Sequence, residues 1–368
     1  MKFKGLKSVR EKLPDSEDDL VEGYLASTRS KLLIILVLLL IAIAIVIFSF
    51  TVYGSMSLAR VFEVFSDHIS GVTYPVHSPE WFDDLKIWDL ALPRVIFCII
   101  AAVGLAIAGA SMQTAMNNPL ADPYTVGISS GACLGLAVAL SIGFSVNNGD
   151  LLGIKIFAFI FSLFPLILIL ILAPRTHSSP STLILAGVAL SYLFNAANTI
   201  IMVTVDSETL EAIYTWQVGT VSNISWENIP MTLSFVTIGS LIVALLSRKL
   251  NLLSLGDASA TSLGVDPDNL RMICLVAIAF IVGAIVGSAG IIGFIGLVSP
   301  HIVRYFIGSD NRFVLPAASL LGIIMILVAD ILCRWFTVYD DMPVGAMLAI
   351  IGAPIFLYLI IRRNSNVW

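Results

Sequence analysis

The stretch from Arg271 to Arg304 places the strongest constraint on how this chain can fold. Between these two arginines lie 32 residues that include no Lys, Arg, Asp or Glu. A membrane-spanning helix needs about 20 apolar residues, so the run is too long for one helix and too short for two full helices with a loop. We predict one full span from Arg271 to about Ala289, a break, and a shorter helix to about Phe306.

The predicted break falls on three glycines, Gly290, Gly293 and Gly296, spaced three residues apart. Glycine permits sharp backbone bends and close contact between helices. Irregular backbone at membrane depth is tolerated only where protein or a water-filled cavity covers it. The break is therefore expected beside other helices or a cavity.

Eight further apolar runs raise the number of predicted spans to ten. The chain is 58% hydrophobic and 12% charged, whereas soluble domains carry about 25% charged residues. The expected fold class is an all-α polytopic membrane protein. The additional runs are 32–52, 93–112, 124–144, 153–173, 182–204, 229–247, 313–334 and 344–361.

Basic residues orient the predicted helices. With ten spans and a cytoplasmic N-terminus, 15 of the 20 Lys and Arg lie on the cytoplasmic side, where positive charge is retained. The first run is too long for a signal peptide and lacks a small-residue cleavage site. We therefore expect a multi-pass protein of the cytoplasmic membrane, with both termini in the cytoplasm. Its expected parts are a cytoplasmic tail (1–31), a transmembrane domain (32–363) with an extracytoplasmic loop (54–92) and a cytoplasmic loop (249–270), and a C-terminal tail (364–368).

No catalytic constellation is visible in the sequence. The motifs GxxxxGK[ST], HExxH and CxxC are absent, so we expect no enzyme activity and no ATP site in the chain itself. The four cysteines lie in apolar runs without paired spacing and predict neither a disulfide nor a metal site. No cofactor is expected. A membrane enzyme or scaffold without transport activity remains an alternative that no residue supports.

A short polar helix is predicted directly before the long uncharged run. Asp257 can cap a helix that begins at Ala258, and Gly264 suits the left-handed residue that closes it. Pro267 then prevents its continuation. The small side chains between these caps would let another surface approach closely. An ordinary solvated loop is the alternative.

Polar side chains within the spans are few. Ser191, Asn195 and Asn198 share one face of the 182–204 helix, because they are spaced four and three residues apart. Amides in lipid are costly unless they face protein or water, so these residues either line a pathway or join helices by hydrogen bonds. Asp330, with Arg334 one turn later, is the nearest candidate for an intramembrane charge. A proton- or sodium-coupled transporter usually needs acids in its helices.

Six blocks of the sequence resemble permease subunits of ABC importers for iron–siderophore complexes, haem and cobalamin. The resemblance covers about residues 32–363 and implies a bundle like that of the cobalamin-importer permease. The blocks are LPRV (92–95), GASMQTAMNNPLADPYTVGISSGA (109–132), LILAGVAL (183–190), SLGV (262–265), GFIGLVSPHIVR (293–304) and PVGAMLAIIGAPIF (343–356).

The resemblance also implies a function and partners. The chain would form a pore with a second, identical or homologous permease, above two ATP-binding cassette ATPase subunits and below an extracytoplasmic substrate-binding protein. The substrate class would be a metal chelate, iron–siderophore first and haem or cobalamin next. No nucleic acid is implied. An ion-coupled secondary transporter of a small solute is the alternative.

The resemblance assigns roles to residues at three places. The segment that would contact the ATPase consists of Asp257, Ala258, Ser259, Ala260, Thr261, Ser262, Leu263, Gly264 and Val265. The cytoplasmic gate would consist of Asn118, Leu120, Ser179, Pro180 and Ser181, with Pro180 in place of a frequent hydroxyl residue.

Arg94 and Arg334 match positions that dock the binding protein. Ala91 stands where relatives often carry a second arginine, so docking here would use fewer pairs. Two acidic pairs, 83–84 and 340–341, could instead hold both arginines locally.

Overall fold

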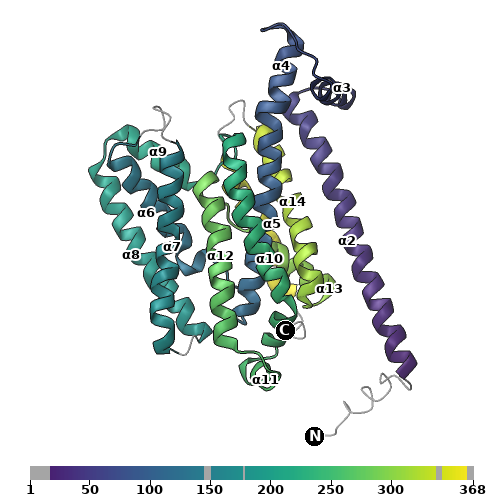
Figure 1. Cartoon of the computed structure of the whole chain (residues 1–368), viewed down its shortest axis with the longest axis vertical. Coiled ribbons are helices and arrows are strands. Elements are labelled where there is room, and N and C mark those ends of the chain that lie inside the picture. Colours follow the sequence, from purple (N-terminus) through teal and green to yellow (C-terminus); the bar gives the residue numbers. More distant parts are fainter. Residues whose placement is uncertain (1–16, 145–150, 177–178, 337–341, 363–368) are drawn as a thin grey trace.

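The computed structural model is built of helices throughout the residues it describes, which are 17–144, 151–176, 179–336 and 342–362 (Figure 1). Within this part, ten apolar helices confirm the predicted all-α polytopic fold. Seven are long enough to span a membrane: α2 (Glu17–Gly54), α5 (Leu92–Ala115), α7 (Leu151–Thr176), α8 (Pro180–Thr204), α10 (Ile229–Leu253), α12 (Pro267–Ala289) and α14 (Asn311–Phe336). Three are shorter: α6 (Ile128–Ser141), α13 (Ile295–Ile307) and α15 (Val344–Arg362).

α5 forms the centre of the bundle and packs against α10, α12, α13 and α14. Its second half is built largely of Ala, Gly and Ser, so neighbouring backbones approach closely. The tightest approach is to α13, because a Cβ at Gly109 would lie 1.8 Å from the Gly296 carbonyl oxygen. This contact fixes α13 directly on α5.

The break in the long uncharged run lies where the glycines predict it. α12 ends at Ala289, Gly290 has a φ of +74°, and α13 begins after Phe294, whose φ is +70°. Thr220 donates its backbone N–H to the Ala289 carbonyl at 2.9 Å, next to the end of α9 (Ser207–Gln217). The irregular backbone is thus covered by protein, as expected for membrane depth.

α6, α7 and α8 form a second group beside the central helices (Figure 1). A Cβ at Gly131 or Gly135 would lie 2.5 Å from a backbone carbonyl of α7. α8 contacts α6 and the short helix η2 (Pro123–Val126), where a Cβ at Gly187 would lie 2.6 Å from the Thr125 carbonyl oxygen. Gly131 and Gly135, four residues apart on α6, therefore allow α6 and α7 to pack closely.

The segment that follows α2 is mostly helical. It contains α3 (Leu58–Ile69), α4 (Pro79–Leu85) and η1 (Lys86–Ala91), and η1 leads directly into α5. Its acids are engaged locally, Asp83 with the Arg60 Nε at 2.9 Å and Asp84 with the His68 Nδ1 at 2.7 Å. At the other end of α2, the helix extends beyond its apolar run and begins at Glu17.

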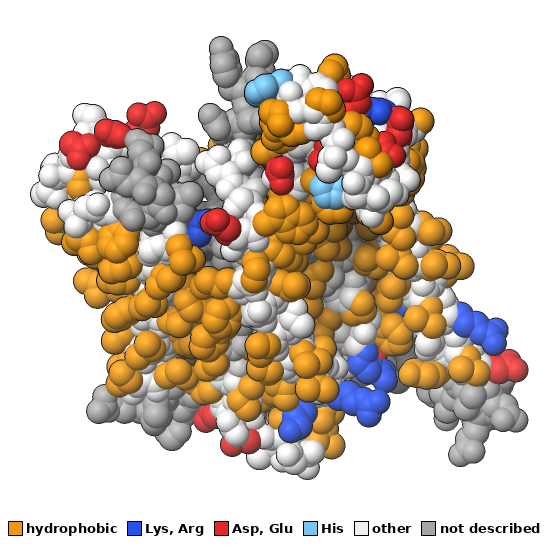
Figure 2. All heavy atoms as spheres, turned by 45° about the horizontal axis from the view of Figure 1, so that its top comes forward, with side chains coloured by type: hydrophobic (Ala, Val, Ile, Leu, Met, Phe, Trp, Pro, Cys, Tyr) orange, Lys and Arg blue, Asp and Glu red, His pale blue; other side chains and the backbone are white. Residues whose placement is uncertain are grey.

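The two ends of the bundle differ in charge. The short helix α11 (Asp257–Ser262) lies at the end opposite α3, α4 and α9 (Figure 1), and we call the α11 end the inner end. Figure 2 shows a broad apolar band with Lys and Arg mainly on its inner side and Asp and Glu mainly on its outer side. This distribution is that expected of a protein whose inner end faces the cytoplasm.

Candidate transport pathway and coupling helix

The predicted polar helix exists as α11 and stands out from the bundle. Of its side chains only that of Ala260 is buried. Gly256 before it and Gly264 after it both have positive φ, +95° and +81°, so the predicted left-handed closing residue is confirmed. The predicted cap is wrong, because Gly256 occupies the cap position and Asp257 is the first helical residue.

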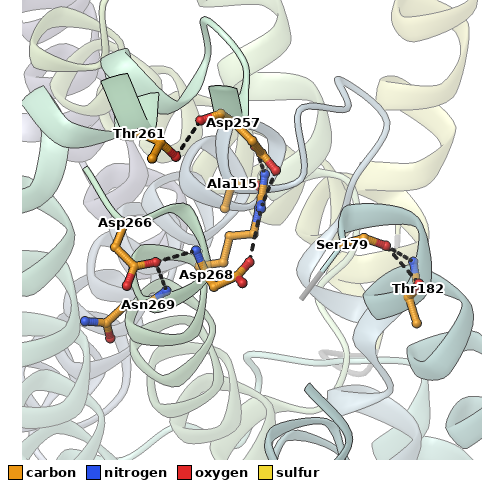
Figure 3. Close-up of polar contacts among 9 residues, drawn as sticks. Ala115, Ser179, Thr182, Asp257, Thr261, Asp266, Asp268 and Asn269 are labelled. Carbon is orange, nitrogen blue, oxygen red and sulfur yellow. Dashed lines mark hydrogen bonds and ion pairs between the residues drawn. The ribbon is translucent and has the colours of Figure 1, made fainter. Parts of the chain in front are cut away.

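The Asp257 carboxylate is held by an arginine instead. Arg271, on the second turn of α12, donates from Nη1 at 3.0 Å and from Nη2 at 2.5 Å to its two oxygens (Figure 3). The Arg271 Nε donates to the carbonyl of Ala115, the last residue of α5, at 2.9 Å. One buried guanidinium therefore joins α11, α12 and α5.

A second arginine, Arg304, binds the same end of α5. Arg304 of α13 donates from Nη2 to the Ala110 carbonyl at 3.1 Å and to the Thr114 hydroxyl at 2.8 Å. It also donates to Asn311 Oδ1 at 3.1 Å, and Asn311 in turn donates to Asn251 Oδ1 at 2.9 Å. The inner ends of α5, α10, α13 and α14 are thereby connected.

The two turns predicted as a gate lie at the inner end and are each stabilised locally. The side-chain oxygen of Asn118 accepts the Leu120 N–H at 2.9 Å. Ser179 caps α8 and its hydroxyl lies 2.8 Å from that of Thr182 (Figure 3). Pro180 takes the first position of α8, where its missing N–H is not needed, and Ser181 follows it. Within the described residues, no side-chain hydrogen bond joins one turn to the other.

The first turn leads into η2 through a half-buried acid, Asp122. Asp122 accepts the Tyr124 N–H at 2.9 Å and so caps η2. Burial raises the pKa of the Asp122 carboxyl to about 6, despite this hydrogen bond. The Tyr124 hydroxyl donates to the Ile292 carbonyl at 3.0 Å, which ties η2 to the break between α12 and α13.

The predicted pathway residues line a polar cavity of about 340 Å³. Ser191 donates to the Gly187 carbonyl of its own helix, whereas the side-chain oxygen of the buried Asn198 has no protein partner among the described residues. A buried amide oxygen without a protein partner suits a cavity that water or a solute can enter. The lining is completed by Asn195 of α8, Tyr124, Ser129, Ser130 and Cys133 of the η2–α6 region, Gln217 of α9 and Ile291 of the break.

The outer ends of α2, α5 and α14 share a cluster of charges. Arg94 forms an ion pair with Asp330, and the two side chains are 3% and 0% exposed. The Arg94 Nε donates to Asp330 Oδ1 at 3.2 Å. The Tyr53 ring contacts two cations, with the Arg334 guanidinium carbon 3.6 Å from its centroid and that of Arg94 at 5.2 Å.

Comparisons with known proteins now decide the family. The model of the FecCD transport family matches residues 32–362. The chain belongs to the FecCD transport family. The hemin transport system permease protein of Yersinia pestis is 37% identical over 284 residues, covering 76% of this chain and 84% of that one. The vitamin B12 import system permease protein of Klebsiella pneumoniae is 37% identical over 290 residues, covering 78% and 86%.

A solved structure supports the same relationship. It is described as an inward-facing ABC transporter of the metal-chelate type, with 28% identity and a TM-score of 0.77 over 90% of this chain and 99% of that chain. The family and the helices together make this FecCD chain a multi-pass membrane protein.

Sequence reasoning about this FecCD chain missed several residues of the site. Tyr124, Ser129 and Ser130 lie in one of the resembling blocks, but they were not assigned to the pathway. Arg271 and Arg304 appeared only as the ends of an uncharged run. The sequence could have indicated that they join helices, because an arginine that borders such a run needs hydrogen-bond acceptors from neighbouring helices if it is buried.

The outer cluster shows which acid Arg94 meets. Asp330 pairs with Arg94 of α5, 236 residues away in the chain. Ala91 is fully buried in η1. The 340–341 acids lie outside the described residues. Arg94 thus lies inside the protein, whereas the side chain of Arg334 is half-buried.

Proposed function

We propose that this chain is the membrane-spanning permease subunit of an ATP-driven importer for metal chelates. An iron–siderophore complex is the first candidate substrate, and haem or cobalamin the next. Two permease chains would enclose the pathway, with two ATPase subunits at the inner end and a substrate-binding protein at the outer end. The transport functions named for two relatives, of hemin and of vitamin B12, support the chelate class.

The observation that carries the proposal is α11. It is a short exposed helix of small side chains at the basic inner end, isolated between two glycines, with one buried contact through Ala260. Nothing in a self-contained transporter requires such a projecting helix. A surface of this kind fits a partner that approaches from the cytoplasm, and the segment 257–265 would meet the ATPase.

The cavity on α8 supplies the pathway in this proposal. Ser191, Asn195 and Asn198 offer uncharged hydrogen-bonding groups, which suit a large solute that must be released as well as bound. The turns that contain Asn118, Leu120, Ser179, Pro180 and Ser181 would close the pathway at its inner end. Replacing Asn198 by Leu should lower uptake while leaving ATP hydrolysis measurable.

In this proposal, Arg334 makes the main contact with the binding protein. Arg94 would be available only if its pair with Asp330 opened, because both side chains are buried. Arg334 is partly accessible beside Tyr53 at the outer end. Its planar fork suits a carboxylate on the partner. Arg334→Glu should slow capture of the loaded binding protein, most strongly at low salt.

The deciding experiment is reconstitution in liposomes with an ATPase subunit and a substrate-binding protein whose genes adjoin that of this chain. ATP-dependent uptake of a labelled iron–siderophore complex, haem or cobalamin is expected. Ala258→Arg places a bulky charge on the exposed face of α11 and should abolish uptake, whereas Asn269→Arg, exposed on the neighbouring turn, should not. Uptake driven by a proton or sodium gradient without ATP would contradict the proposal.

A further inference from the structure

α11 is joined to the bundle by two flexible connections. Gly256 and Gly264 both adopt positive φ, and a Cβ at either would meet no atom within 4 Å. Inside the helix, only the Ala260 side chain is buried. A helix held in this way can rotate about its ends unless a specific contact fixes its orientation.

That contact is the ion pair of Asp257 with Arg271. The carboxylate accepts two hydrogen bonds from the planar guanidinium, so both distance and angle are fixed. The Arg271 side chain is 1% exposed, whereas that of Asp257 is 51% exposed. The arginine therefore belongs to the rigid interior, and the acid belongs to the projecting helix.

The same guanidinium reaches the end of α5. The last carbonyls of a helix have no hydrogen-bond donor within the helix. The Ala115 carbonyl is one of these, and it accepts a hydrogen bond from Arg271 Nε at 2.9 Å. The turn of Asn118 and Leu120 follows at once and is tied back by the Asn118 N–H, which donates to the Gln113 carbonyl at 3.0 Å. The first gate turn thus extends from the part of α5 that Arg271 holds.

We infer that Arg271 is a positioning residue that transmits displacement of α11 to the inner end of α5 and to the turn at residues 116–123. The inference rests on the proposed function, because it takes α11 as the helix that the ATPase moves. Without the arginine, rotation at the two glycines would absorb the movement. With it, α11, α12 and α5 move together.

Two substitutions break the connection at different ends. Arg271→Lys keeps the charge but loses the two-pronged contact and the Nε donor to Ala115. Asp257→Asn keeps the shape of the exposed acid and removes its charge, and its amide oxygen can still accept a hydrogen bond from Arg271. Asp266→Asn is the matched control, because Asp266 is an exposed acid in the same loop whose capping of α12 an asparagine can also perform.

The measurement is substrate transported per ATP hydrolysed by the reconstituted complex. We expect Arg271→Lys and Asp257→Asn to lower this ratio by about 2- to 30-fold, with the control unchanged. Spin labels on Leu120 and Leu263, both exposed, should keep a constant distance with and without ATP in the parent protein, whereas in either variant this distance should change with ATP.

The outcomes separate the inference from the proposed function. If the parent complex shows no ATP-driven uptake, the proposed function itself is wrong. If the parent is active and both variants keep its ratio and its constant distance between the labels, the inference alone is overturned. It is equally overturned if the variants lose activity only through a lower melting temperature, since that result indicates a purely structural contact.

Discussion

α5 and α8 are apolar helices of nearly equal length, 24 and 25 residues, in opposite surroundings. In its most apolar stretch, the helix that contains α5 is 83% buried within the chain, whereas α8 is 11% buried. α5 turns small residues to four neighbouring helices. α8 turns large ones outward, among them Leu185, Tyr192 and Leu193. Hydropathy predicts that both helices cross the membrane, but residue size distinguishes a helix surrounded by protein from one that faces lipid or a second subunit.

The largest expected effect concerns the buried ion pair at the outer end of α5. Asp330→Ala leaves the Arg94 charge buried without its carboxylate and should cost about 3–5 kcal/mol of unfolding free energy. Replacing both residues, Arg94→Met with Asp330→Leu, should recover most of this loss, because no charge is then buried. Unfolding in mild detergent measures both.

Asn195→Ala on α8 is the control for this experiment. Asn195 is exposed in the chain, so its removal should change the unfolding free energy by less than about 0.5 kcal/mol. If the Asp330→Ala variant and the parent protein have equal unfolding free energies, the outer end of α5 is far more open to water than the structure shows.

The next effect tests the close approach of α5 and α13. Gly109→Ala places a methyl group 1.8 Å from the Gly296 carbonyl oxygen, so one of the two helix backbones must shift. We expect a loss of about 1–3 kcal/mol or failure to fold. Gly293→Ala is the matched control, since a Cβ there meets no atom within 4 Å. Similar yields and melting temperatures for both variants would show that α13 does not pack as described.

Much of this arrangement was predictable from sequence. The length of the uncharged run and its glycines gave the break between α12 and α13, because span length and backbone freedom are local properties. The ion pair of Arg94 and Asp330 joins residues 236 positions apart, and no sequence pattern indicates which acid meets which base. The same holds for Arg271, whose partners lie on α11 and α5. On α8, spacing placed the polar residues on one face, but the residues facing them came from tertiary packing.

A smaller effect is expected at Asp122, between α5 and α6. Its pKa in the folded protein, about 6, exceeds the ordinary value of 3.8, so the folded state favours the protonated acid. The stability from this preference is complete below about pH 4 and is lost as the pH rises through 6. Asp122→Asn stays neutral and can still cap η2. Its free energy of unfolding should therefore exceed that of the parent by about 1 kcal/mol or less at pH 8. At pH 4 the two values should be equal.

Asp122→Ala separates charge from capping. It also removes the carboxylate but loses the acceptor for the Tyr124 N–H, which should cost about 1 kcal/mol at every pH. A melting difference between Asp122→Asn and the parent that does not depend on pH would contradict the raised pKa.

The smallest effect is expected at Leu193 of α8, and Leu105 of α5 is its comparison. Leu193 of α8 is 60% exposed, and Leu105 of α5 is 1% exposed. Leu105→Ala should cost about 2–5 kcal/mol, because it opens a cavity in packed protein. Leu193→Ala should change the unfolding free energy of the single chain by less than about 0.5 kcal/mol, because its neighbours there are lipid or detergent. If Leu193→Ala destabilises only the assembled permease, α8 contacts another subunit. If it destabilises the single chain as strongly as Leu105→Ala does, α8 is not the exposed helix described above.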